Sequence, residues 1–145
     1  MSSAELAKTL ADLANRPEIR TVAFVPSQAR CDAALIALAC DDLLMGPKAE
    51  LGGSGERVLS AEEIADLVEM IRNPEGPWKA RPWSLVAAMI DSGLKVYACQ
   101  QEGEEDHVRY LCDEQREELE EKPGAKKWEK GPEVTRPKQP LLVNG

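Results

Sequence analysis

Hydrophobic residues are most concentrated in residues 21–55, where the pattern changes from strand to helix and back to strand. Residues 21–25 form a short β-branched and aromatic run that Pro26 ends, which is typical of a strand buried on both faces. Residues 32–40 are apolar nearly all round and predict a buried helix. The apolar run 43–45 predicts a second strand. We therefore expect a β-α-β unit with parallel strands, the basis of an α/β fold.

Two amphipathic helices flank this unit. The first is expected at about residues 3–15, with Ser2 or Ser3 as its cap. The second follows Ser60, which forms a capping box with Glu63 and precedes a stripe of apolar residues at helical spacing. Both patterns predict helices that bury one side and expose the other.

The second half of the chain has a different pattern. Residues 94–99 and 108–111 alternate between apolar and polar side chains, so they predict a β-hairpin whose acidic tip spans residues 100–106. An acidic helix is expected at residues 113–121. The tail after residue 122 contains four prolines among many charges, which predicts mostly irregular structure with Trp128 and the run 141–143 as its anchors.

Charge and composition exclude several classes of function. The formal net charge of −8 argues against a surface for nucleic acid or anionic membrane. The first residues lack the basic and apolar regions of a secretion signal, and no stretch reaches the ~20 apolar residues that span a bilayer. The chain as given is therefore interpreted as soluble and cytoplasmic.

The cysteine pattern argues against a metal site. Cys31, Cys40, Cys99 and Cys112 show no C-x-x-C spacing, and His107 is the only histidine. Without a secretion signal, reduced thiols are expected rather than disulfides. No metal and no cofactor are predicted.

Cys31 is the candidate for chemistry because it lies where the chain leaves a strand and enters the buried helix. Unpaired backbone N–H groups and the helix dipole favour negative charge at such a turn and would lower the pKa of a thiol. Cys31 could then act as a nucleophile beside donors for an oxyanion. The alternative is that Cys31 is a small core residue next to an alanine-rich helix.

Residues 29–42, with the sequence ARCDAALIALACDD, together with residues 45–47 and 51–52, resemble the ClpP/crotonase-like protease domain of NfeD-family membrane proteins. The resemblance implies a ClpP/crotonase-like α/β fold. It places Cys31 at the position of the family's serine nucleophile and Glu62 near the position of its lysine base. A carboxylate cannot replace that lysine, so the Ser–Lys dyad is expected to be lost.

The resemblance also implies a domain organisation. Residues 1–93 would form a truncated ClpP/crotonase-like core, and residues 94–145 a hairpin, an acidic helix and a proline-rich tail. In the family, a further strand and a glycine turn precede the first helix and supply part of the oxyanion hole, and nothing in this chain corresponds to them. Longer family members continue into transmembrane helices, which would place such a domain at a membrane.

Three functional hypotheses follow from the resemblance. The first is a catalytically inactive protease-like domain that binds or scaffolds partners in membrane-associated protein quality control, with stomatin-like membrane proteins and a homodimer as the implied partners. The second is a hydrolase or peptidase with Cys31 as nucleophile and Lys48, Lys79 or His107 as base. The third is an acyl-CoA-binding relative of the crotonases, which is suggested only by the shared fold.

Overall fold

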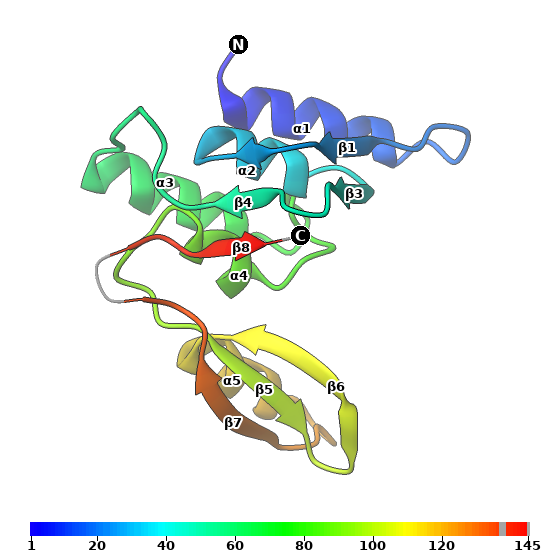
Figure 1. Cartoon of the computed structure of the whole chain (residues 1–145). Coiled ribbons are helices and arrows are strands. Elements are labelled where there is room, and N and C mark those ends of the chain that lie inside the picture. The colour runs from blue at the N-terminus through cyan, green and yellow to red at the C-terminus, as the bar shows by residue number, and fades with distance from the viewer. Residues whose placement is uncertain (137–138, 145) are drawn as a thin grey trace.

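The computed structural model describes residues 1–136 and 139–144 and shows a mixed α/β chain with two lobes (Figure 1). The amino-terminal lobe contains α1 (Ser3–Ala14), β1 (Val22–Val25), β2 (Gln28–Ala29), α2 (Asp32–Leu38), β3 (Asp42–Met45), β4 (Glu50–Gly52), α3 (Ala61–Arg72), α4 (Trp83–Ala88) and β8 (Leu142–Asn144). The carboxy-terminal lobe contains β5 (Tyr97–Gln101), β6 (Glu104–Leu111), α5 (Asp113–Glu120) and β7 (Trp128–Glu133).

The predicted β-α-β unit is confirmed. β1 pairs with β3 in parallel, with Phe24 opposite Leu44, and α2 connects the two sides. The same two segments continue as the parallel pair β2 and β4, and the Glu50 N–H donates to Ser27 O at 2.9 Å just before this second pair. β8 then pairs with β4 in the antiparallel direction, so the end of the chain returns to the amino-terminal lobe.

α2 lies at the centre of the larger core. Leu35 and Leu38 are 1% and 4% exposed, and the Trp78 indole N–H donates to Leu35 O at 2.8 Å. The prediction that Ile36 is also largely buried is wrong. Ile36 is half-buried because it lies one turn from the exposed Ala33, on the side of α2 that faces solvent.

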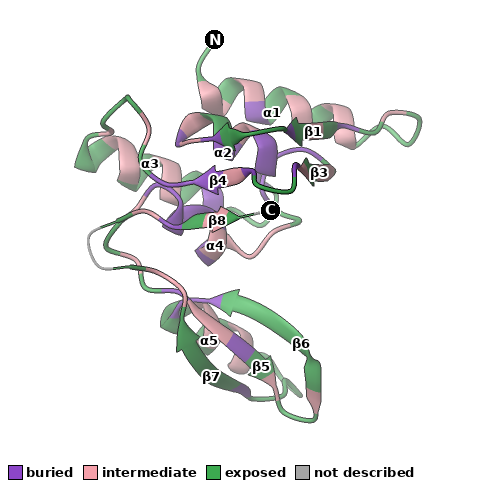
Figure 2. Cartoon of the chain, in the orientation of Figure 1, coloured by how far each residue is buried: buried purple, intermediate pink, exposed green. Residues whose placement is uncertain are grey.

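The prediction that the first strand is buried on both faces is also wrong. Val22 and Phe24 are 54% and 67% exposed, and Leu44 on the neighbouring strand is 56% exposed. In Figure 2, whose colours mark burial, β1 alternates between exposed and more buried residues. The physical reason is that α1 and α2 cover only one face of the sheet, toward which the alternate residues Ala23 and Val25 point.

The helix boundaries agree with the capping patterns. Ser2 caps α1 in a reciprocal box with Glu5, and Ser60 caps α3 in a reciprocal box with Glu63. α5 lies within the predicted acidic helix at residues 113–121. Cys112 caps α5, and its sulfur accepts from the Gln115 N–H at 3.4 Å. In the part of the chain that the structure describes, no helix is long and apolar enough to cross a membrane.

The carboxy-terminal lobe is an antiparallel sheet in the order β6-β5-β7, with α5 packed beside it (Figure 1). The predicted hairpin is confirmed as β5 and β6, although its tip is a short turn at Glu102 and Gly103 rather than a seven-residue loop. Gly103 has a φ of 82°, which a side chain rarely adopts and which lets the chain reverse in so few residues.

The prediction of a mostly irregular tail is wrong. β7 pairs with β5, and β8 pairs with β4. Pro132 is tolerated because β7 is an edge strand and its pairing with β5 shifts register near that residue. Of the predicted anchors, Trp128 and Leu141 are confirmed, at 9% and 5% exposed, whereas Leu142 of the run 141–143 is 40% exposed. Residues 137, 138 and 145 of this tail lie outside the described residues.

Candidate functional site

Cys31 occupies a sharp turn between β2 and α2. Its backbone has φ 45° and ψ −114°, and among the described residues it is the one non-glycine residue with positive φ. A conformation of this kind costs roughly 1–3 kcal/mol and is held only by the surrounding structure. The turn directs the chain from the short strand into the buried helix, as the sequence predicts for Cys31.

A pocket of about 210 Å³ lies against Cys31. The glycine loop at residues 53–55 forms one wall, and Met89 and Ile90 after α4 contribute to another. Gly55 is required there because a Cβ atom at this position would lie 2.9 Å from the Cβ of Cys31. The absence of a side chain at Gly55 therefore lets the loop pass directly over the cysteine.

The environment of Cys31 opposes ionisation of its thiol. Burial raises the pKa of Cys31, and the negative charge of Asp32 raises it further. The Asp32 backbone N–H and the Arg57 guanidinium lower the pKa, but they are the weaker influences. The expectation that the helix start lowers this pKa is therefore wrong, because the thiol is only 9% exposed and has a carboxylate as its neighbour.

Arg57 is the cation at this pocket. Its guanidinium pairs with Asp32 at 3.4 Å and also with Glu63, so it links the first turn of α2 to the first turn of α3. A guanidinium stays protonated at every physiological pH and cannot accept a proton as a general base. Arg57 can bind a negative group or hold the two helices together.

The base candidates from the sequence do not meet Cys31. The candidates Lys48, Lys79 and His107 are exposed, and so is Glu62, which the resemblance places near the lost lysine, in the first turn of α3. None of these four residues lines the pocket at Cys31. Among the described residues, Cys31 therefore lies at its pocket without Lys48, Lys79 or His107 beside it.

Two arginines of this region are not identifiable from the sequence. Arg57 contacts Asp32 across 25 residues. Arg30 pairs with Glu50 and donates to Gly52 O at 3.3 Å, which fastens the glycine loop to the turn at Cys31. Both contacts join segments that are far apart along the chain, so no local pattern indicates them.

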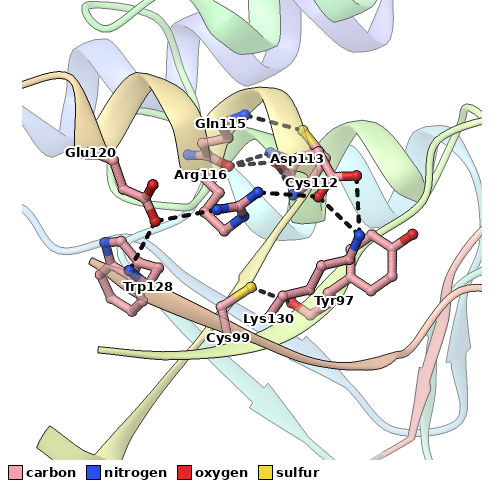
Figure 3. Close-up of polar contacts among 10 residues, drawn as sticks. Tyr97, Cys99, Cys112, Asp113, Gln115, Arg116, Glu120, Trp128 and Lys130 are labelled. Carbon is pink, nitrogen blue, oxygen red and sulfur yellow. Dashed lines mark hydrogen bonds and ion pairs between the residues drawn. The ribbon is translucent and has the colours of Figure 1, made fainter. Parts of the chain in front are cut away.

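The polar cluster of the carboxy-terminal lobe is drawn in Figure 3. Arg116 lies between Asp113 and Glu120 at 3.7 and 3.3 Å, and Glu120 accepts from the Trp128 N–H at 2.9 Å. Lys130 pairs with Asp113 at 3.1 Å. These charges pair with one another, so the cluster fastens α5 to the sheet.

Cys99 lies within this cluster and is fully buried, and burial raises its pKa. All four cysteines are free thiols. Within residues 1–136 and 139–144, no group of three or more histidine, cysteine, aspartate or glutamate side chains is arranged to hold a metal ion. Each of the four cysteines is buried.

A comparison of the chain with protein-family models, with curated proteins and with solved structures finds no match.

Proposed function

We propose that this chain is a divergent ClpP/crotonase-like domain of the NfeD type that does not hydrolyse peptides and that binds or scaffolds partners instead. One observation carries the proposal: Cys31, which the resemblance places at the nucleophile's position, has a raised pKa, and Lys48, Lys79 and His107 do not line its pocket. The parallel β-α-β unit followed by a glycine loop is the arrangement that the sequence resemblance implies.

The expected loss of activity is large. In hydrolases with a nucleophile, a base and an oxyanion site, these groups act as a unit, and removal of one catalytic member typically lowers kcat by roughly 10⁴–10⁶. Cys31 has neither the lysine of the family nor a lowered pKa to compensate for it. A thiol that stays protonated at neutral pH is a weak nucleophile.

The test is cleavage of unstructured hydrophobic peptides by the purified chain, by Cys31→Ala and by Cys40→Ala as the matched control, since Cys40 is another buried free thiol. We expect all three proteins to release no product above the buffer rate. Turnover that disappears in Cys31→Ala and persists in Cys40→Ala would overturn the proposal.

That outcome would favour the second candidate function, a hydrolase with Cys31 as nucleophile. The strained backbone at Cys31 is the observation in its favour, because sharp strand-to-helix turns of this kind expose the nucleophile in many hydrolases. The acyl-CoA hypothesis has less support, since a pocket of about 210 Å³ is below the ~300–1,000 Å³ of small-molecule sites.

The implied partners are stomatin-like membrane proteins and a second copy of the domain. Binding to a purified stomatin-like domain, measured by calorimetry, tests the first of these. Saturable binding would support a scaffolding role, and absence of heat at concentrations far above those of the cell would contradict this partner.

A further inference from the structure

The outer edge of β1 is open. β1 has β3 as its neighbour on one side, and within residues 1–136 and 139–144 no strand pairs with its other side. Val22 and Phe24, the alternate residues of this short strand, are 54% and 67% exposed. β1 therefore presents apolar side chains and a free edge at the same place.

The backbone of the same two residues faces this free edge. Thr21 O accepts from the Asp42 N–H at 3.1 Å, and Val25 O accepts from the Gly46 N–H at 2.9 Å, so these odd-numbered residues face β3. Backbone groups of successive residues in a strand point to opposite sides. The N–H and C=O groups of Val22 and Phe24 therefore point outward, where a further strand would bind them.

The two edge strands of the carboxy-terminal sheet carry protecting residues that β1 lacks, and β3, whose outer side is also unpaired among the described residues, begins with the charged Asp42. β6 carries Glu104, Glu105 and Asp106, and β7 carries Lys130 and Pro132. Charges and prolines of this kind prevent pairing with other chains. Residues 21–29, in contrast, contain no charged side chain, although 30% of the whole chain is charged.

We propose that β1 pairs in the antiparallel direction with β1 of a second copy of this chain, around a two-fold axis at Ala23. Val22 then lies opposite the second copy's Phe24, and Phe24 lies opposite its Val22, so each pair exchanges backbone hydrogen bonds and covers an exposed apolar side chain. Val22 and Phe24 lie symmetrically on either side of Ala23. The edge of β1 is therefore self-complementary, as a two-fold interface requires.

The charge distribution favours association of two copies at the edge of β1 rather than elsewhere on the surface. Each copy has a formal net charge of −8, which opposes association over most of the surface. The uncharged segment 21–29 is where two copies can approach with the least repulsion, and Arg20 beside it is already paired with Asp42. Added salt should therefore strengthen the dimer.

This proposal assigns a surface to the second copy that the proposed function already implies as a partner. Pairing of β1 does not depend on the chemistry of Cys31, so a peptidase result would leave it unchanged. The first test is sedimentation velocity of the full chain over a range of concentrations, at low and at moderate salt. We expect the mass to rise from 15.9 kDa toward twice that value as the concentration increases. A mass of 15.9 kDa at all concentrations would overturn the proposal.

Phe24→Lys tests the interface itself. It places a charge at an exposed position of the proposed β1–β1 interface. We expect it to raise the dissociation constant of the dimer at least about tenfold. Val58→Lys is the matched control, because Val58 is 89% exposed and lies in the loop beside the Cys31 pocket, away from β1. A dimer that Phe24→Lys leaves intact would overturn the proposed interface.

Amide hydrogen exchange on the unmodified chain gives an independent result. The N–H groups of Val22 and Phe24 should exchange rapidly in dilute solution and slowly in concentrated solution, whereas those of Ala23 and Val25 should be slow in both. Dimer formation without slower exchange at Val22 and Phe24 would place the contact elsewhere and contradict the proposal.

Discussion

Replacement of Ser84 by alanine tests how the two lobes are joined. Ser84 lies near the start of α4 and is fully buried. Its hydroxyl donates to Gln115 Oε1 of α5 and accepts from the Cys112 N–H at 3.0 Å. The Ser84 N–H donates to the same Gln115 oxygen at 3.1 Å. A single hydroxyl thus connects the amino-terminal lobe to the cap of the helix in the other lobe.

The expected cost follows from what the hydroxyl leaves behind. Alanine fits the site, but the Cys112 N–H then has no acceptor in a buried position, and Gln115 loses one of its two donors from Ser84. An unpaired buried donor costs about 1–3 kcal/mol, so Ser84→Ala should lower the free energy of unfolding by that amount. Ser92→Ala is the control, because Ser92 is exposed and should change stability by less than about 0.5 kcal/mol.

Urea denaturation followed by circular dichroism measures both variants. The midpoint should fall for Ser84→Ala with an unchanged slope, since the surface exposed on unfolding stays the same. Because Ser84 and Gln115 share their hydrogen bonds, the double variant with Gln115→Ala should cost less than the sum of the two single changes. A Ser84→Ala stability within about 0.5 kcal/mol of the control would refute this account.

Two further predictions concern the backbone and pH. Gly52→Ala should destabilise the chain far more than Gly103→Ala in the same urea assay, because both have positive φ but only at Gly52 would a Cβ atom meet Leu141 O, at 2.2 Å. The backbone N–H and hydroxyl of Thr21 donate to the Asp41 carboxylate and hold its pKa below the ordinary value. The free energy of unfolding should therefore fall as the pH drops below about 4. Thr21→Val should reduce this acid sensitivity in unfolding curves measured at stepped pH.

Local signals predicted much of the amino-terminal lobe. The apolar helix at residues 32–40 and the runs on either side of it predict the parallel unit, since each element is defined by its own hydrophobic pattern. The capping boxes at Ser2 and Ser60 involve residues three positions apart, and both helices begin where those boxes indicate.

Long-range pairing explains what the sequence did not predict. β7 forms from a charged, proline-containing segment because it completes a sheet with β5, and β8 pairs with β4 some 90 residues earlier in the chain. β1 is exposed on one face because no second layer covers it, which its own residues do not reveal. Contacts of this kind depend on the whole fold and override local preference.

The same distinction applies to the candidate site. The position of Cys31 at the strand-to-helix turn follows from local sequence, and the structure agrees. The direction of its pKa does not, because burial and Asp32 outweigh the backbone donors at the start of a short helix. The role of Arg57 also depends on helices brought together only by the fold.

The pH dependence of alkylation at Cys31 tests the central claim most directly. The rate of reaction with iodoacetamide, followed by mass spectrometry of the peptide that contains Cys31, gives the thiol pKa from the position of its inflection, whatever the accessibility of the sulfur. We predict an inflection above the ~8.5 of an ordinary thiol, and a lower one in Asp32→Asn, because that change removes the negative charge beside Cys31. An inflection below about 7.5 would show an activated cysteine and contradict the account.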